Sequence, residues 1–290
     1  MKVAVIVHVF YPELWPHLAQ CIRSIGDEKD VFASCSSETV ASAVVRDFPA
    51  AKVVIVENRG YDVWPFLKIL NTLDLERYSH VVKLHTKRTI CHPHQMHGYD
   101  MRGTIWRELL LSFVDTPQKW AESRRLILGD ATVGMVSHPR CILGRRDMGR
   151  SERKSFDRAA EMARELFGGT VDYRKAEYVA GTIFLVRANL LAPLQGRFKA
   201  EDFELADVNR TETLAHVLER LFGMCVAAKG LRIADPRDSR NSWETRWQLW
   251  SHEFRAALRD FFFQSKITRK GHHVIKVCKI PIWHGKERAR

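Results

Sequence analysis

The chain has 290 residues, of which 46% are hydrophobic and 28% are charged, a composition typical of a folded globular protein. No apolar run reaches the roughly 18 residues that a membrane-spanning helix needs, which argues against such a helix. With 46 basic against 34 acidic residues, the formal charge of +12 favours phosphate-bearing partners: nucleotides, nucleic acids or anionic membranes.

The first half of the chain alternates predicted strands with predicted helices. The near-continuous β-branched run at its start is typical of a buried parallel strand, and Gly26 is expected to end the first helix. The pattern predicts strands over Lys2–Val9, Val31–Cys35, Ala51–Glu57 and His80–Leu84, and helices over Leu14–Ile25, Thr39–Phe48 and Trp64–Leu75. This alternation predicts an α/β fold with a mostly parallel central sheet flanked by helices.

The second half continues with fewer strands. Helices are predicted over Trp106–Phe113, Gln118–Leu128, Arg150–Leu166 and Thr213–Phe222, and strands over Val133–Val136 and Ala180–Arg187. The helix over Arg150–Leu166 is basic and amphipathic. Gly223 is expected to end the helix that starts at Thr213.

The character of the chain changes after about Asp235. Three phenylalanines, Phe261–Phe263, precede a basic cluster of Lys266, Arg269, Lys270, Lys276 and Lys279. We therefore expect a domain over residues 1–235 and a basic, aromatic C-terminal extension over residues 236–290. Aromatic side chains beside basic ones can lodge at an anionic bilayer surface. The alternative is that the phenylalanines pack on the domain and the lysines form a solvated face.

Two polar motifs follow predicted strands. His85, Lys87 and Arg88 stand at the end of the fourth predicted strand, in the segment YSHVVKLHTKR. In open α/β sheets, ligands bind in the crevice outside the carboxyl ends of the strands. These side chains are therefore candidates to bind an anionic diphosphate, and the alternative for His85 is a strand-end histidine that caps a loop.

The second motif follows the third predicted strand. Gly60 permits a tight turn or a positive φ, and Arg59 can contact a phosphate bidentately. Asp62, a candidate catalytic or ligand-binding carboxylate, also stands just before a helix, where Asp is a favoured N-cap. Asn58, Arg59, Gly60 and Asp62 are therefore expected near a ligand, and an N-cap role for Asp62 does not exclude ligand contact.

The order and spacing of several segments resemble the rhamnan synthesis F family of bacterial glycosyltransferases. These segments are VHVFYPELW, NRGYDVWPFL, KLHTKR, AGTIFLVRANLLAPL and TLAHVLERLFG, within residues 3–225. The resemblance implies a GT-A-like domain that transfers a sugar, rhamnose above others, from a nucleotide diphosphate to a cell-surface polysaccharide or O-antigen glycan. Related enzymes also occur in galactose-containing pathways, so a galactosyl or galactofuranosyl donor stays open.

The resemblance also implies where metal chemistry would be found. A metal-dependent enzyme of this kind often carries Asp-x-Asp at the strand end where this chain has His85-Thr86-Lys87-Arg88. We therefore expect side-chain cations, not a divalent metal, to neutralise a dTDP- or UDP-linked donor. No cofactor is expected.

The catalytic base is expected near the start of the helix at Thr213. Inverting GT-A enzymes usually place an acidic residue there, which points to Glu212. The family tends to show Asp-Gly-Thr before Leu-Ala-His, so the acid here is displaced by one residue. Asp207 and Glu204 are alternatives, and a helix N-terminal acid favoured by the macrodipole is the structural explanation for Glu212.

Three further residues are candidate substrate contacts. Gly181 and Thr182 lie near the start of a predicted strand, where the glycine lets a ligand approach closely. His216 lies on the helix after Glu212, where a structural role is nearly as well supported.

Cys91, His92, His94 and His97 are close enough in sequence to suggest a zinc site. Their spacing matches no established closed site, however, and a role in an acceptor-binding loop is the alternative.

Cellular location and competing functions follow from the same residues. The six cysteines are scattered with no CxxC pair, and Met1–Phe10 lacks the basic region of a signal peptide. We expect a cytoplasmic protein, peripheral at the inner membrane, that meets a lipid-linked glycan acceptor. RNA-recognition signatures are absent, so no nucleic-acid partner is expected. The competing class is a non-catalytic module that binds polyanions with strong salt dependence.

Overall fold

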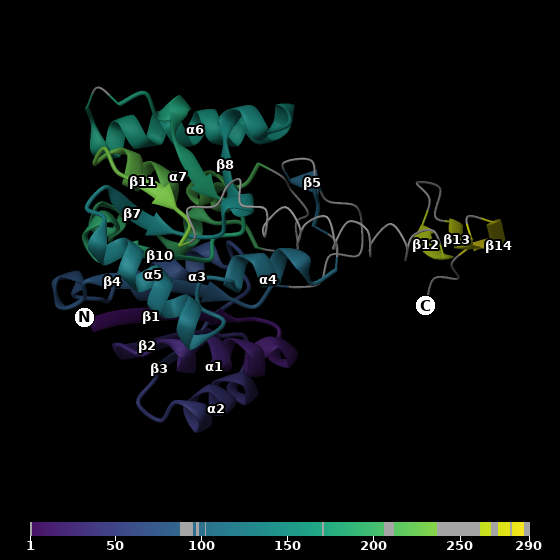
Figure 1. The fold of residues 1–290 in the computed structure, drawn as a ribbon, viewed down its shortest axis with the longest axis horizontal. Helices are drawn as coiled ribbons and strands as arrows, with labels where there is room; N and C mark the ends of the chain where they lie inside the picture. Colours follow the sequence, from purple (N-terminus) through teal and green to yellow (C-terminus); the bar gives the residue numbers. More distant parts are fainter. Residues whose placement is uncertain are drawn as a thin grey trace. The chain divides into compact units, whose positions relative to one another are not determined.

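The structure, a computed structural model, describes residues 2–87, 95–96, 99–101, 103–169, 171–205, 212–236, 262–267, 272–278 and 280–286. The chain forms two compact units. The first combines Met1–Arg88 with Arg107–Asp238, and the second combines Thr89–Trp106 with Ser239–Arg290. The division predicted at residue 235 stays a prediction. The first unit contains the central sheet (Figure 1).

The central sheet has seven strands in the order β11-β7-β10-β4-β1-β2-β3. β1 is parallel to β2 and β4, β2 is parallel to β3, and β11 is parallel to β7, whereas β10 is antiparallel to both of its neighbours. The strands are β1 (Lys2–Val9), β2 (Glu28–Cys35), β3 (Lys52–Ile55), β4 (His80–His85), β7 (Val133–Val136), β10 (Phe184–Arg187) and β11 (Arg232–Ala234). The predicted α/β fold with a mostly parallel central sheet is confirmed, and its GT-A-like character stays a prediction.

Helices flank this sheet close to where the sequence predicts them. They are α1 (Trp15–Ser24), α2 (Glu38–Asp47), α3 (Val63–Leu70), α4 (Ile105–Leu111), α5 (Pro117–Gly129), α6 (Arg150–Phe167) and α7 (Leu214–Ala227). Ser37 and Thr116 cap α2 and α5 by accepting hydrogen bonds from backbone N–H groups. α3 ends five residues before the predicted Leu75, which instead begins a short 3-10 helix.

Gly223 does not end α7, contrary to the prediction. The helix continues through it to Ala227 because Gly223 is the point where α7 packs against β9 (Glu177–Val179). A Cβ at this position would lie 2.0 Å from the carbonyl oxygen of Glu177. The glycine therefore permits close packing between two backbones rather than a change in chain direction.

The single strand predicted over Ala180–Arg187 is also wrong. β9 ends at Val179, and the chain turns before β10 starts at Phe184. Gly181 and Thr182 form this turn with φ angles of 94° and 50°. β9 pairs with β8 (Ile142–Gly144), outside the central sheet. The turn delivers two predicted site residues to the sheet surface.

Aromatic side chains fill the space between the sheet, α3 and α7. Phe66 on α3 lies 5.5 Å from Phe222 on α7, and both contact Phe184 on β10, at ring-centre distances of 6.4 and 5.7 Å. All three are buried. This core gives the polar site next to it a rigid apolar base, since edge-to-face aromatic pairs add to the stabilisation from buried area.

Three antiparallel strands form a separate sheet in the second unit. They are β12 (Phe263–Ile267), β13 (His272–Val277) and β14 (Ile280–Lys286), and a two-stranded sheet of β5 (Gln95–Met96) and β6 (Tyr99–Asp100) belongs to the same unit. The Phe262 and Ile280 side chains are exposed. No helix among the described residues has both the length and the apolar character needed to cross a membrane. Membrane contact by this region stays a prediction.

Candidate functional site

The candidate site lies at the carboxyl edge of the central sheet, where β1 and β4 end. His8 on β1 pairs in register with His85 on β4. From β1 the strand order runs through β2 to β3 on one side, and β4 lies on the other side. In open α/β sheets such a switch in strand order is where ligands bind.

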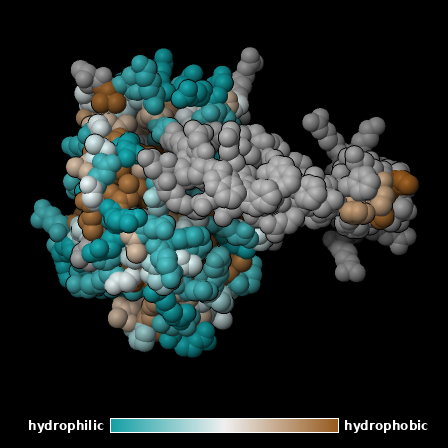
Figure 2. Space-filling model, viewed as in Figure 1, coloured by the Kyte–Doolittle hydropathy of each residue, from teal (hydrophilic) through white to brown (hydrophobic). Residues whose placement is uncertain are grey.

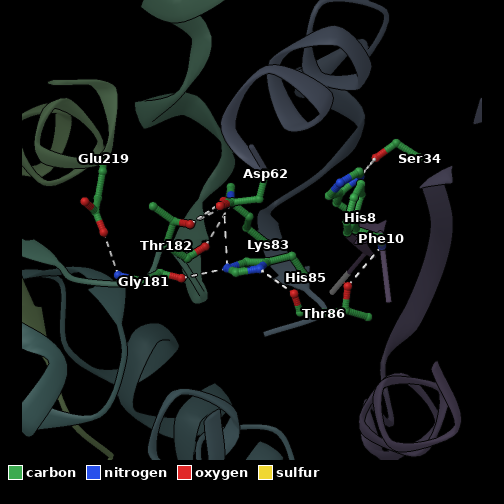
Figure 3. A network of polar contacts seen from close by, with 10 residues as sticks. All are labelled: His8, Phe10, Ser34, Asp62, Lys83, His85, Thr86, Gly181, Thr182 and Glu219. Atoms are coloured by element: carbon green, nitrogen blue, oxygen red, sulfur yellow. Dashed lines mark hydrogen bonds and ion pairs between the residues drawn. The ribbon is translucent and has the colours of Figure 1, made fainter. Parts of the chain in front are cut away.

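A buried lysine lies at the centre of the site. Lys83 on β4 has a side chain only 1% exposed, and its ammonium forms an ion pair with the Asp62 carboxylate. It also donates to the carbonyl and hydroxyl oxygens of Thr182, each at 3.0 Å. The Thr182 hydroxyl in turn donates to Asp62 (Figure 3). An ammonium has three protons, so this arrangement gives each of them an acceptor.

The His85 ring is held by backbone carbonyl groups. Nε2 lies 2.8 Å from the Gly181 oxygen, Nδ1 lies 3.2 Å from the Thr86 oxygen, and Nε2 lies 3.8 Å from Asp62 Oδ2. His85 is 5% exposed. His85 therefore positions the Gly181 turn, and donation from its ring to a diphosphate stays a prediction.

Glu219 on α7 fixes the same turn from the other side. Its Oε1 accepts a 2.6 Å hydrogen bond from the Gly181 N–H (Figure 3). Its Oε2 is ion-paired with Arg220. Arg220 also donates to the His216 carbonyl at 2.8 Å, and its guanidinium lies 4.8 Å from the centre of the Tyr178 ring. The Gly181 turn is therefore held by β4 through His85 and by α7 through Glu219.

Thr86 joins the ends of β1 and β4. Its hydroxyl oxygen accepts hydrogen bonds from the backbone N–H groups of Phe10 and Tyr11, both at 3.0 Å, and its own N–H donates to the His8 carbonyl. His8 is buried, and its Nδ1 lies 3.0 Å from the Ser34 hydroxyl on β2. Three neighbouring strands thus contribute polar groups to one edge (Figure 3).

The two loops that meet at Asp62 share an unusual backbone conformation. Gly60 and Tyr61 have φ angles of 61° and 55°, and Gly181 and Thr182 have φ angles of 94° and 50°. A tyrosine or a β-branched threonine in the left-handed region is strained. Such strain persists only where surrounding contacts enforce it, and it concentrates at ligand-binding and active sites.

The electrostatic environment keeps Asp62 ionised. Burial alone would raise its pKa, but His85, the Lys83 ammonium and the hydrogen bonds from Lys83 and Thr182 hold it well below its ordinary value. Burial lowers the pKa of Lys83, and the Asp62 carboxylate opposes that change. Burial likewise lowers the pKa of His85, which favours a neutral ring at neutral pH. The 2.8 Å contact to Gly181 is where the single proton of a neutral ring fits best.

Asp62 occupies the N-cap position of α3, as predicted, but its side chain does not cap the helix. The carboxylate is instead turned toward the sheet, where it contacts Lys83 and Thr182. Of the predicted site residues, the structure therefore brings together Asp62, His85, Gly181 and Thr182.

Arg59 and Gly60 face a different neighbour. The Arg59 guanidinium donates to the Phe203 carbonyl at 2.6 Å and to Glu57 at 3.2 Å. The Gly60 N–H donates to the Glu204 carbonyl, and a Cβ on Gly60 would lie 2.6 Å from the Phe203 ring. The positive φ of Gly60 confirms that this loop requires glycine. Contact of Arg59 or half-buried Asn58 with a phosphate stays a prediction.

Lys87 follows Thr86 at the edge of the site. Burial lowers its pKa, while Asp62 and Glu219 act to raise it. Its carbonyl accepts a 3.2 Å hydrogen bond from Arg107. Lys87 therefore remains a candidate ligand of an anionic group next to the buried network.

The first turn of α7 approaches the site through an aromatic contact. The His216 ring lies 5.7 Å from the Tyr61 ring and its Nδ1 lies 2.7 Å from the Thr213 hydroxyl. Burial lowers the pKa of His216. Glu212 lies two residues before the first residue of α7, and its half-exposed carboxylate is 3.4 Å from the Lys154 ammonium on α6.

Some predictions fall on residues outside the described part of the chain. They concern Arg88, the alternative base Asp207, and the cluster of Cys91, His92, His94 and His97. Among the described residues, no group of three or more His, Cys, Asp or Glu side chains could hold a metal ion. A metal-independent reaction stays a prediction.

Sequence reasoning missed Lys83, Glu219 and Thr86. Lys83 had a signal, because a lysine in the middle of the apolar segment VVKLH is almost never buried without a partner. Glu219 had none, since an acid on a helix is usually solvated. Its contact with Gly181 depends on tertiary packing between residues 38 positions apart.

The chain belongs to the rhamnan synthesis protein F family, whose sequence pattern matches residues 1–231. A protein named WxcX from Xanthomonas campestris pv. campestris strain B100 is 25% identical over 233 residues, which is 79% of this chain and 32% of WxcX. WxcX from strain ATCC 33913 matches with the same identity and coverage. The chain thus spans about a third of the length of these curated relatives.

Two solved structures are distantly similar. A crystal structure of S. aureus TarS residues 1–349 has a TM-score of 0.38 at 9% identity, covering 77% of this chain and 55% of that one. A CMP:2-keto-3-deoxy-manno-octonic acid synthetase complexed with CTP has a TM-score of 0.39 at 9% identity, covering 81% of this chain and 90% of that one.

Proposed function

We propose that this chain is a glycosyltransferase that moves a sugar from a nucleotide diphosphate to a growing cell-surface polysaccharide or O-antigen glycan. The observation that carries the proposal is the Asp62–Lys83–Thr182 network at the strand-order switch of the sheet, in a chain of the rhamnan synthesis protein F family. Rhamnose is the favoured sugar, and a dTDP- or UDP-linked donor is expected. The acceptor is expected to be a lipid-linked glycan presented at the inner membrane surface.

Lys87 is the proposed partner of the leaving diphosphate. Sugar transfer builds negative charge on that group, and a preorganised cation stabilises it most in a site that excludes water. Lys87 directly follows Thr86, which ties β4 to the loop after β1. Arg88 is proposed to act beside it, and the reaction is proposed to need no divalent metal.

The buried network itself is proposed to be a scaffold and not an acid–base catalyst. A carboxylate whose pKa is held far below neutrality is a poor proton acceptor, so Asp62 is unsuited to deprotonate a sugar hydroxyl. The Asp62 carboxylate can instead accept a hydrogen bond from a hydroxyl group of the nucleotide sugar. Glu212, at the start of α7, is the proposed base of an inverting displacement.

The proposal is tested by thermal unfolding with dTDP, UDP or GDP, each in EDTA and each with Mn²⁺. A nucleotide at 100 times its Kd stabilises a protein by about 2.7 kcal/mol. We expect one nucleotide to raise the melting temperature in EDTA. Stabilisation only with Mn²⁺ would overturn the metal-independent mechanism, and no response to any nucleotide, together with salt-sensitive binding to unrelated polyanions, would favour a binding module.

Variants localise this effect. Lys87→Ala is expected to lose most of the nucleotide-dependent shift. Lys229→Ala, a matched change at an exposed lysine just after α7, is expected to retain it. A screen of dTDP-rhamnose, UDP-galactose and UDP-galactofuranose as donors then distinguishes a rhamnosyltransferase from a galactosyl- or galactofuranosyltransferase.

A further inference from the structure

A second basic feature of the first unit lies outside the network described above. A cavity of about 750 Å³ is lined by Arg145, Arg146, Arg153, Asp172, Arg174 and Lys175. Its volume lies within the roughly 300–1,000 Å³ typical of small-molecule sites. We call this group of residues the arginine pocket. Two short 3-10 helices, Arg145–Asp147 and Tyr173–Lys175, and the first turns of α6 form its walls.

The arginine pocket holds more positive charge than its own carboxylates neutralise. Arg145 is paired with Asp157 through two hydrogen bonds of 2.7 and 2.8 Å, and Lys175 lies 3.7 Å from Asp172. The other three lining arginines have no ion pair or side-chain hydrogen bond with any residue in the described part of the chain; they are Arg146, Arg153 and Arg174.

These unpaired guanidinium groups repel one another. The hydrogen bonds from Arg145 are the main cause that lowers the pKa of the Asp157 carboxyl. The positive charges of Arg174 and Arg153 lower it further, which places both near the same carboxylate. Several cations that face one cavity without matching anions raise the free energy of the folded state. An anionic ligand would remove that repulsion on binding.

The chemistry of the lining favours phosphate over carboxylate. Guanidinium groups present planar forks that bind phosphate oxygens bidentately, and four of the five cations here are arginines. A carboxylate carries one charge, whereas each phosphate group carries about −1.5 to −2. α6 starts at Arg150 and runs for 18 residues, and Glu152 in its first turn accepts a hydrogen bond from the Gly149 N–H, which offsets part of the positive potential of its amino-terminal dipole.

The surface around α6 is consistent with a polar ligand. In the view of Figure 2, most of the atoms along the edge where α6 lies are hydrophilic. Lys154 of α6, next to Arg153, contacts Glu212 before α7. The helix that contributes to the arginine pocket therefore also contacts the segment that holds the proposed base.

We infer that the arginine pocket binds a diphosphate group, either of a soluble anion or of a lipid headgroup. The inference does not depend on the proposed function, because binding to this pocket requires no turnover and no nucleotide. Arg146, Arg153 and Arg174 supply the hydrogen bonds, and Arg145 is held in place by Asp157.

The test is calorimetric titration of the full chain with inorganic pyrophosphate at about 150 mM salt, where long-range charge effects are screened within about 8 Å. We expect saturable binding that Arg146→Ala and Arg174→Ala each weaken roughly tenfold or more, the usual effect of losing one charged hydrogen bond. Arg164→Ala, the same change at an exposed arginine near the other end of α6, should alter the affinity less than twofold. Equal losses in all three variants would indicate diffuse attraction and overturn the inference.

A second comparison separates this pocket from the candidate active site. Arg146→Ala and Arg174→Ala should retain any nucleotide-dependent thermal shift while they weaken pyrophosphate binding. Pyrophosphate binding that neither arginine variant weakens would assign the anion to another site and overturn the inference. Sedimentation with phosphatidylcholine vesicles, with and without a polyprenyl diphosphate, then identifies the source. Vesicle binding that depends on both the lipid diphosphate and Arg146 supports a headgroup, and pyrophosphate binding without vesicle binding supports a soluble diphosphate.

Discussion

The Lys83 ammonium and the Asp62 carboxylate form an ion pair at the carboxyl edge of the central sheet, with the lysine side chain almost completely buried. Lys83 comes from the middle of β4, and Asp62 comes from the loop that starts α3. The pair is completed by Thr182, 120 residues after Asp62 in the chain. Segments distant in sequence are thus held at one point, next to the crevice where a ligand is expected.

Breaking this pair on one side should be more damaging than removing both charges. Lys83→Met is expected to lower the free energy of unfolding by about 3–5 kcal/mol, because it leaves the Asp62 carboxylate without its cation. The double variant Asp62→Asn with Lys83→Met should recover part of this loss. Urea unfolding of the two single variants and the double variant measures the coupling; additive effects would mean that the pair is not coupled in solution.

Stability should fall in mildly acidic solution because of buried histidines. Burial lowers the pKa of His8 to about 4, from an ordinary value of 6.5. Burial also lowers the pKa of His80 to about 4, and neither of its ring nitrogens has a hydrogen-bond partner. Between these pH values the unfolded chain binds protons that the folded chain does not, so stability decreases as the pH falls from 6.5 toward 4.

The size of this effect is about 3 kcal/mol for each histidine when the whole interval is crossed. Denaturant midpoints measured at several pH values in this range give the slope. His8→Gln should flatten that slope, and His17→Gln, at a half-buried histidine on α1, serves as the matched change. An unchanged slope in His8→Gln would show that His8 is not the titrating group.

The contact between α7 and β9 should tolerate no side chain at Gly223. A Cβ there would meet the Glu177 carbonyl at 2.0 Å, and backbone on both sides prevents relief by a rotamer change. We expect Gly223→Ala to cost about 3 kcal/mol or more, at the upper end of overpacking effects. Gly129→Ala, at the end of α5 with nothing within 4 Å of the added carbon, should be neutral or slightly stabilising. Similar melting temperatures for the two variants would contradict the packing described here.

The role of Glu212 can be separated from that of a surface acid. If it deprotonates the acceptor, Glu212→Gln should lower kcat by about 100-fold or more with little change in the KM for the donor. Glu201→Gln, at an exposed glutamate, is the control. A decrease in kcat of less than about threefold would reject Glu212 and direct attention to Asp207.

The sequence predicted the elements of the sheet but not the contacts across its edge. Alternating strands and helices were sufficient to locate β1 to β4, and the polar segments after β3 and β4 correctly marked the carboxyl edge. The convergence of Asp62 with Thr182 was not predictable, because it depends on β10 lying antiparallel beside β4. Local pattern carries no information about that pairing.

Two glycines show what sequence alone can and cannot predict about the role of a glycine. Gly60 was expected to permit a tight turn or a positive φ, and its φ is 61°. Gly223 was expected to end a helix, yet it lies within α7 because another backbone passes close to it. A glycine can serve conformation or close approach, and only the three-dimensional neighbours distinguish the two.

The Thr86 hydroxyl has a consequence for what the crevice can accept. A hydroxyl has two lone pairs and one proton, and here the N–H groups of Phe10 and Tyr11 occupy the lone pairs. The Thr86 hydroxyl can therefore only donate a hydrogen bond to a ligand, along the one tetrahedral direction that remains. A ligand oxygen with a free lone pair can accept this hydrogen bond. An ammonium group cannot, because it has no lone pair and both lone pairs of the hydroxyl are already occupied.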